Sequence, residues 1–179
     1  MKNQKSINLS EIDLLKYVNL DEEKVIVASG GKKNCNVMIT NDVTFGIMRD
    51  KAIATIYLEP DFYTKGYIEK KSQFSINLMS LTKDNKEIFE SLSSGSGRDE
   101  DKFKKSGLTL KMISDVPTVE EAQYVLICNV IYRNHLSKND FFEDYKKFAK
   151  KEFKKDYDYA FVAEIVEVYE IVEEDSDTK

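Results

Sequence analysis

Six short runs of β-branched and other apolar residues restrict the fold of this chain more than any other feature. Each run has the length and composition of a β-strand, and turn-forming residues such as Gly30, Gly31 and Pro60 follow two of them. The runs cover residues 24–29, 36–40, 52–58, 74–78, 124–132 and 159–171. Because helical patterns separate only some of these runs, a doubly wound parallel sheet is disfavoured. We therefore predict a mainly β (α+β) fold, an antiparallel barrel with peripheral helices.

Four segments have helical spacing instead of strand alternation. In the first, Ile12, Leu15 and Val18 lie three residues apart behind Ser10, which predicts a short amphipathic helix capped by that serine. The third ends before Gly107, a residue type favoured just after a helix. The predicted helices cover residues 10–20, 84–93, 98–106 and 140–155. In the last, the stripe formed by Phe141, Tyr145 and Phe148 predicts packing against the barrel or a partner.

The composition is that of one globular domain. Hydrophobic residues make up 41% of the 179 residues, and the net charge is only −5 with both signs interspersed. This charge gives no electrostatic reason to expect a nucleic-acid or membrane partner. The first twenty residues carry several charges and no apolar core of a signal peptide, so we expect a cytoplasmic protein. We predict a single domain over residues 1–172 and an acidic flexible tail over 173–179.

Cysteine and histidine are scarce, which limits the chemistry available to side chains. Cys35 and Cys128 are far apart in sequence, and His135 is the only histidine. A multi-histidine metal site is therefore excluded, and we predict no metal. We interpret Cys35 as a small, partly buried side chain, Cys128 as a core residue, and His135 as an incidental residue of a polar loop.

Four sequence blocks occur in the order known from one protein family. They are N-V-M at residues 36–38, F-G-I-M at 45–48, E-P-D-F-Y-T at 59–64 with I-E at 68–69 and F-S-I-N at 74–77, and S-G-R-D-E-D-K-F at 96–103 with G-L-T at 107–109. Each block alone is weak, but together with looser matches they cover residues 24–170. In this combination the chain resembles the flavin reductase-like family of FMN-binding split-barrel proteins, in particular its flavoredoxin-like subgroup.

The resemblance implies a six-stranded antiparallel Greek-key split β-barrel that forms a homodimer. It also implies that FMN, more than FAD, lies in a groove between the subunits, held by the backbone of one strand and by polar side chains near the phosphate. The cofactor-binding residues that it implies are Ser29, Asn36, Val37, Met38, Ile39, Thr40, Phe45, Tyr63, Thr64 and Lys102. No catalytic acid or base is expected, because a flavin carries the chemistry itself.

Several of these side chains also have an ordinary structural interpretation. Ser29 and Asn36 could satisfy the turn at their strand ends instead of a flavin. Thr64 could cap a helix that begins at Lys65, a role compatible with phosphate binding at the same helix start. Lys102 lies in a strongly charged segment where solvated ion pairs are common.

Six positions depart from the family pattern, one of which is Ile39 in place of a threonine, with Thr40 one place on. Asp42 and Arg49 stand where relatives of this subgroup have tryptophans, and Asp158 replaces a histidine. Glu59 and Phe62 replace two arginines that flank the proline. An acidic side chain beside a phosphate is repulsive, so three alternatives are open. A threonine and lysines hold the phosphate, or FMN binds weakly, or Glu59 faces elsewhere.

We hypothesise that the chain is a flavin-dependent oxidoreductase. It would move hydride or electrons between a reduced nicotinamide or a donor protein and an acceptor, through bound FMN. The alternatives are a non-catalytic flavin-binding electron carrier or sensor, and a partner-binding barrel without flavin. A glycine-rich dinucleotide fingerprint is absent from the sequence, so the sequence does not locate a nicotinamide.

Overall fold

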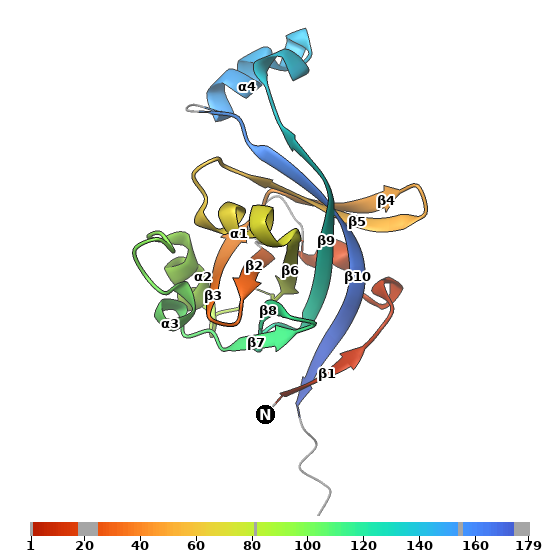
Figure 1. Cartoon of the computed structure of the whole chain (residues 1–179), viewed down its shortest axis with the longest axis vertical. Coiled ribbons are helices and arrows are strands. Elements are labelled where there is room, and N and C mark those ends of the chain that lie inside the picture. Colours follow the sequence, from red (N-terminus) through yellow and green to blue (C-terminus); the bar gives the residue numbers. More distant parts are fainter. Residues whose placement is uncertain (1, 18–24, 81, 154–155, 174–179) are drawn as a thin grey trace, which may run out of the picture.

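A computed structural model describes residues 2–17, 25–80, 82–153 and 156–173, and one antiparallel sheet dominates it (Figure 1). The strands follow the order β3-β2-β6-β9-β10-β5-β4, and β1 pairs with β10 beside this path. They are β1 (Lys2–Ser6), β2 (Val25–Gly31), β3 (Asn34–Thr40), β4 (Val43–Met48), β5 (Lys51–Leu58), β6 (Gln73–Leu78), β9 (Tyr124–His135) and β10 (Tyr159–Glu173). In the described residues β3 and β4 remain edges, so the barrel is split, as predicted.

All six predicted strands are present, and the structure adds four that the sequence pattern did not indicate. Two of these, β7 (Leu110–Ile113) and β8 (Val116–Val119), form a separate hairpin. The third, β1, has the polar sequence KNQKS and pairs with β10 through its backbone while most of its side chains are exposed. The fourth, β4, contains the F-G-I-M block. The predicted six-stranded sheet therefore has eight strands, because β1 and β4 join it through backbone pairing with β10 and β5.

The predicted helix over residues 10–20 is wrong. The described part of this segment forms two 3₁₀ turns, η1 (Leu9–Glu11) and η2 (Leu14–Tyr17), and Leu15 is 80% exposed. Asn8, not Ser10, precedes η1, and its backbone N–H donates to Glu11 Oε1. A spacing of three residues fits a 3₁₀ turn as well as an α-helix, and two separated buried side chains, Ile12 and Tyr17, anchor the segment instead. Val18 lies outside the described residues.

Four α-helices are described: α1 (Tyr63–Lys71), α2 (Lys86–Ser93), α3 (Lys102–Ser106) and α4 (Lys146–Glu152). The predicted helix over 84–93 is confirmed as α2, which buries Phe89 and Leu92. The helix predicted over 98–106 begins later, at Lys102, because the Asp101 carboxylate accepts from the Lys104 N–H and so caps the helix. It ends at Gly107, whose φ of 75° is the left-handed conformation expected there.

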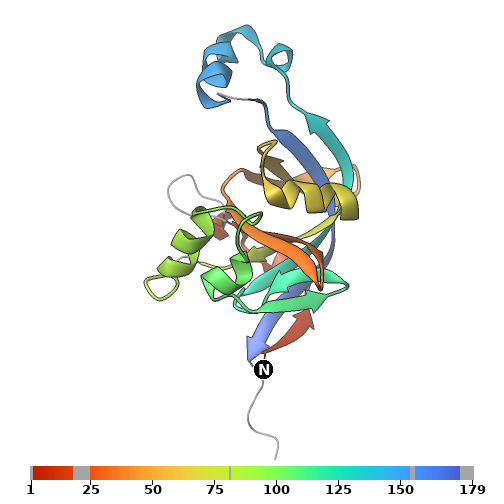
Figure 2. The same cartoon turned by 60° about the vertical axis from the view of Figure 1, so that its left-hand side comes forward.

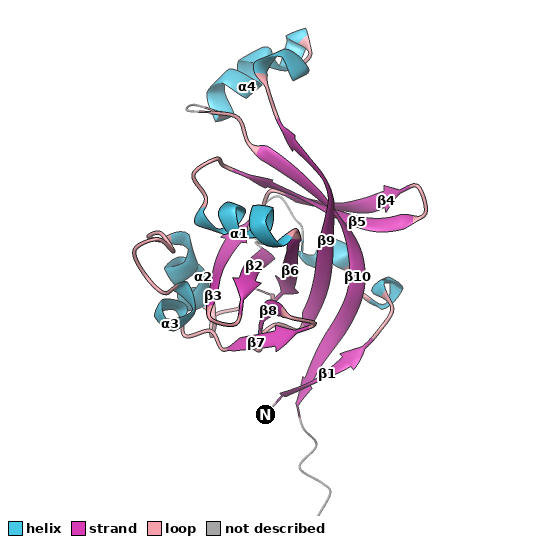
Figure 3. Cartoon of the chain, viewed as in Figure 1, coloured by secondary structure: helices cyan, strands magenta, loops and turns pink. Residues whose placement is uncertain are grey.

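Two hydrophobic clusters lie on the two faces of the sheet. Along β2, Val25 and Val27 belong to the cluster that also contains Phe74 and Phe161. The alternate residues, such as Ile26, belong to the cluster under α2, α3 and the β7–β8 hairpin. Burial on both faces explains why this run is apolar at nearly every position. The helices α1, α2 and α3 accordingly lie beside the β2–β3 end of the sheet (Figure 3).

The strands β9 and β10 continue beyond the sheet and carry α4 at the far end of the arm that they form (Figures 1 and 2). The helix predicted over 140–155 is broken there into η3 (Lys138–Asp140), η4 (Glu143–Tyr145) and α4. Its aromatic stripe packs only in part: Phe141 contacts the rings of Phe153 and Tyr157. Tyr145 and Phe148 remain 65% and 53% exposed, so they are not buried against the barrel, and packing of this stripe against a partner stays a prediction. Residues 154–155 of the predicted helix lie outside the described part.

Three further expectations concern single residues and the chain ends. Cys128 is fully buried and Cys35 partly buried, as predicted. His135 ends strand β9 instead of lying in a loop, and its ring stacks on that of Tyr159. The predicted tail begins on Glu173, the last residue of β10, and residues 174–179 lie outside the described part. No helix in the described ranges is long and apolar enough to cross a membrane.

Candidate functional site

Two adjoining cavities lie between the edge strand β3, the first turns of α1 and the loop that leads into α3. Their volumes are about 530 Å³ and 340 Å³. Both are lined by Asn34, Tyr63, Tyr67 and Arg98. Ligand sites for cofactor-sized molecules typically occupy about 300–1,000 Å³. The cavities therefore have room for such a ligand beside an exposed sheet edge.

Three of the sequence blocks meet at one buried contact beside these cavities. The Asn36 side-chain amide Nδ2 donates to Thr64 Oγ1 over 2.8 Å, and the two residues are only 5% and 1% exposed. Gly97 packs directly on the same amide, because a Cβ at this position would lie 2.1 Å from Asn36 Oδ1. The helix α1 begins at Tyr63 and not at Lys65 as predicted. Thr64 is therefore its second residue and does not cap it.

Two tyrosines one helical turn apart form an aromatic wall. The rings of Tyr63 and Tyr67 meet edge to face with their centroids 5.2 Å apart, and the Tyr67 hydroxyl donates to Asn34 Oδ1. Burial and the hydrogen bond with Tyr63 raise the pKa of Tyr67 to about 12, so this phenol stays protonated. Arg98 places its guanidinium 5.8 Å from the centre of the Tyr63 ring. The wall thus combines aromatic surface with an exposed cation.

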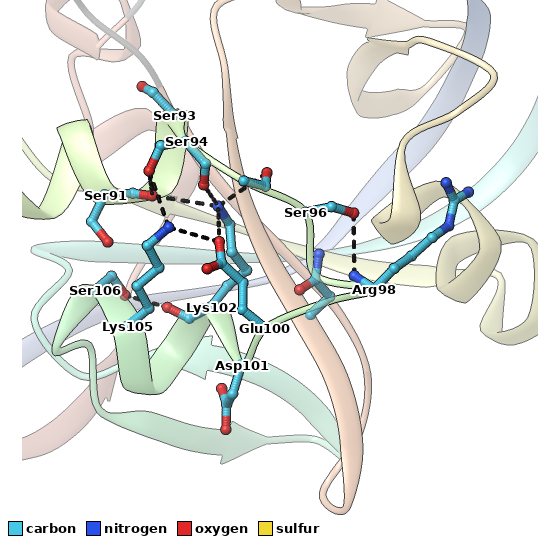
Figure 4. A network of polar contacts seen from close by, with 12 residues as sticks. Ser91, Ser93, Ser94, Ser96, Arg98, Glu100, Asp101, Lys102, Lys105 and Ser106 are labelled. Atoms are coloured by element: carbon cyan, nitrogen blue, oxygen red, sulfur yellow. Dashed lines mark hydrogen bonds and ion pairs between the residues drawn. The ribbon is translucent and has the colours of Figure 1, made fainter.

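Lys102 lines the larger cavity, but its ammonium group is occupied (Figure 4). The side chain is 4% exposed, and Nζ donates to the carbonyl oxygens of Ser91, Ser94 and Gly95 at the end of α2. It also lies 3.6 Å from Glu100 Oε1. Burial lowers the pKa of Lys102. Arg98 points away from this network, so of these two cations only Arg98 is free to meet a ligand (Figure 4).

The structure gathers only part of the predicted binding set around the cavities. Asn36, Tyr63 and Lys102 line the larger one, and Thr64 contacts Asn36. Ser29 is fully buried, and its hydroxyl donates to the Gln73 carbonyl oxygen. The remaining predicted residues contribute their side chains to the two hydrophobic clusters or to a local turn. They are Val37 and Ile39 in the second cluster, Met38 and Phe45 in the first, and Thr40, whose hydroxyl accepts from the Asp42 N–H.

The backbone of β3 is nonetheless available on one side. Because β3 pairs with β2 only, alternate N–H and C=O groups over residues 36–40 point away from the sheet. Several residues that line the larger cavity were not predicted from the sequence, among them Lys32, Lys33 and Tyr67. The lysines directly follow Gly30 and Gly31. Tyr63 and Tyr67 are four residues apart, a spacing that places two side chains on the same face of a helix.

Glu59 faces neither of these cavities. It lines a third cavity, of about 720 Å³, together with Asp42 and Asp158. Burial, followed by the charges of Asp42 and Glu59, raises the pKa of Asp158 to about 6. Of the three alternatives left by the sequence, the structure supports the one in which Glu59 faces elsewhere, and an anion bound near Arg98 does not meet this carboxylate.

The side chains near the larger cavity offer binding groups more than reactive ones. Cys35 lines it, and burial together with the charge of Asp101 raises the pKa of its thiol, which disfavours the reactive thiolate. Within the described ranges, no three His, Cys, Asp or Glu side chains are grouped so that they could hold a metal ion. Any redox chemistry here depends on a bound cofactor.

A model of the family described as flavin reductase like domain matches residues 22–177. No curated protein matches the sequence significantly. Among solved structures, an FMN-binding domain of a flavin reductases-like enzyme from Shewanella baltica has a TM-score of 0.66 at 19% identity, covering 94% of this chain and 78% of the other.

Two further solved structures share the fold. Flavoredoxin from Methanosarcina acetivorans has a TM-score of 0.61 at 17% identity, covering 86% of this chain and 73% of the other. Nitrilotriacetate monooxygenase component B from Bacillus cereus has a TM-score of 0.65 at 15% identity, covering 95% of this chain and 82% of the other. These likenesses establish the split-barrel architecture.

Proposed function

The chain belongs to the family of flavin reductase-like domains, and from this we propose that it binds FMN and works as a flavin-dependent oxidoreductase. The observation that carries the proposal is the meeting of three family sequence blocks at one cavity. Asn36, Thr64 and Gly97, distant in sequence, are in contact there beside an aromatic wall and a free arginine. The flavoprotein neighbours named above support the choice of FMN.

The residues around the cavity suit a planar ring with an anionic tail. The open edge of β3 offers backbone donors and acceptors to a ring, and Tyr63 with Tyr67 offers aromatic surface. The helix α1 begins without a side-chain cap among the described residues, so its first backbone N–H groups are available to a phosphate. Arg98 lies beside this helix start and would supply a charge-assisted hydrogen bond.

Two of the three acidic residues of the neighbouring loop already have partners. Glu100 pairs with Lys105 over 2.8 Å and lies near Lys102. Asp101 accepts from the Lys104 backbone N–H. Because these two carboxylates already have cationic or N–H partners, the charge that a phosphate meets is set by Arg98, Lys32 and Lys33 against the exposed carboxylate of Asp99.

When bound, FMN supplies the capacity for hydride and electron transfer. The chain's own residues would bind and orient it: Asn36 fixes the position of α1 against β3 through Thr64, and Arg98, which lies over the Tyr63 ring, would hold the anionic end. We propose a reduced nicotinamide or a donor protein as the electron source. We further propose that the protein is a cytoplasmic homodimer with the flavin groove between its subunits, since Tyr132 and Val166 expose apolar surface on the β9–β10 face.

Titration with FMN tests the binding proposal directly. We expect flavin fluorescence to be quenched on binding, and the Arg98→Gln variant to bind about tenfold more weakly, the loss of roughly 1.4 kcal/mol expected for one charge-assisted hydrogen bond. Arg49→Gln is the matched control, because it removes the same charge from the β4–β5 turn, away from the cavities.

The same preparation separates the alternatives. Bleaching of the bound flavin by NADH or NADPH, followed by reoxidation with an acceptor, supports an oxidoreductase. Bound FMN without reduction above background selects an electron carrier or sensor. An intact protein that leaves FMN fluorescence unchanged refutes the proposal and points to a barrel that binds a partner instead.

A further inference from the structure

The third cavity, of about 720 Å³, lies between the end of β5 and the arm segment that carries α4. Five aromatic side chains line it, among them Phe62 from the start of α1 and Phe148 and Phe153 from the arm. Six carboxylates line it as well, while no lysine, arginine or histidine of the described residues does. Phe62 and Pro60 also line the smaller cavity beside Arg98, so the two spaces adjoin but differ in charge.

Most of the carboxylates in this cavity have no cationic partner among the described residues. Glu152 has Lys151 nearby, and Asp156 lies 3.5 Å from His135. The carboxylates of Asp42, Glu59 and Asp158 make no ion pair or hydrogen bond with any described residue, and the same holds for Asp61. The raised pKa of Asp158 reflects the cost of holding these charges close together in a partly buried place.

The three acidic residues also come from distant parts of the chain. Asp42 lies before β4, Glu59 follows β5 and Asp158 precedes β10. Folding brings all three carboxylates to one wall of the cavity, which gives that wall an anionic character.

The lining restricts the chemistry of a ligand in this cavity. A metal ion is disfavoured, because no three carboxylate, cysteine or histidine side chains of the described chain are grouped for chelation. Phosphate-bearing ligands, including nicotinamide dinucleotides, are repelled by the carboxylates. Aromatic faces and unpaired carboxylates together favour an organic cation with an apolar body.

We propose that this cavity is a second binding site, for a small organic amine or quaternary ammonium compound. The carboxylates of Glu59 and Asp158 accept hydrogen bonds from a protonated amine. A quaternary ammonium group has no N–H, and the same carboxylates balance its charge. The rings of Phe148 and Phe153 cover the apolar body of the ligand. The site is separate from the proposed flavin cavity and does not require FMN to be bound.

Calorimetric titration of the full chain with phenethylamine tests the proposal, with 3-phenylpropionate as an anionic probe of similar size. We expect the amine to bind and the carboxylate not to bind. The double variant Glu59→Gln/Asp158→Asn should bind the amine at least about tenfold more weakly. Asp144→Asn, which changes an exposed carboxylate of η4 outside the cavity, should bind like the original protein.

Each other outcome overturns the proposal. Equal binding of both probes would mean an apolar pocket without charge selection, and no binding of the amine would mean no site. The amide substitutions keep side-chain size and relieve repulsion, so the double variant should fold, which circular dichroism checks. FMN titration of the same variants is independent: retained FMN binding with lost amine binding separates this site from the flavin site.

Discussion

Replacing Gly97 with alanine tests whether the contact between β3, α1 and the loop before α3 builds the candidate flavin site. The added Cβ would lie 2.1 Å from Asn36 Oδ1, 2.6 Å from its Cγ and 2.8 Å from Nδ2. These distances are all below van der Waals contact, so the whole amide must move. Because Asn36 is 5% exposed and donates to the buried Thr64, the movement breaks a hydrogen bond that water cannot replace.

The expected magnitude follows from two opposing effects. Leaving a buried donor and acceptor unpaired costs about 1–3 kcal/mol of the free energy of unfolding. Replacing glycine with alanine also restricts the unfolded chain, which returns about 0.4–1 kcal/mol, since Gly97 does not need a positive φ. We therefore expect Gly97→Ala to lower the free energy of unfolding by about 1–2 kcal/mol and to weaken FMN binding about tenfold.

Urea denaturation and FMN titration measure the two effects on the same protein. The matched control is Gly46→Ala in β4, where no described atom lies within 4 Å of the added Cβ, so a change below about 0.5 kcal/mol is expected. The Thr64→Val variant lacks the hydroxyl that accepts from Asn36. In that background Gly97→Ala should lower the free energy of unfolding by less than in the original protein. If Gly97→Ala matches Gly46→Ala in both stability and FMN affinity, the reasoning is refuted.

Two further predictions concern α1 and the acidic cavity. Gly66 lies inside α1 with open space around its Cα, so Gly66→Ala should raise the free energy of unfolding by about 0.5–1 kcal/mol in urea denaturation; a loss of stability would contradict the open space. The pKa of Asp158 is raised from 3.8 to about 6, so its charge opposes folding, and this cost appears as the pH rises from about 4 to 6. Asp158→Asn should therefore raise the melting temperature at about pH 8 and not below about pH 4, whereas an equal effect at both values would exclude a charge origin.

Local sequence patterns determined the strands that carry the core. Residues 25–28 are all apolar because both faces of β2 are buried, and residues 74–78 alternate apolar side chains with the buried polar Ser75 and Asn77; both patterns can be recognised without knowledge of the partner strands. The C-terminal end of α3 was likewise predictable, since Gly107 supplies the left-handed conformation locally. In contrast, β1 could not be read from its polar sequence, because it exists through backbone pairing with β10.

The candidate site was predictable only in part. The blocks that contain Asn36, Thr64 and Arg98 could be recognised, but their contacts join segments far apart in the chain. Lys102 shows the limit most clearly: its type and position suggested a phosphate ligand, while its ammonium group is held by the end of α2. Sequence specifies which charges are present, and the partners that neutralise them are decided by the fold.

The sequence predicts the split barrel, but the residues of the candidate site come together only in the tertiary structure. The apolar runs by themselves determine that an antiparallel sheet forms, since burial of apolar surface is a property that each strand carries alone. Only the tertiary arrangement decides that Glu59 lines the same cavity as Asp42 and Asp158 and not the proposed flavin cavity, and that Arg98 stays free. Electrostatic interactions depend on distances between side chains remote in sequence, and folding alone sets those distances.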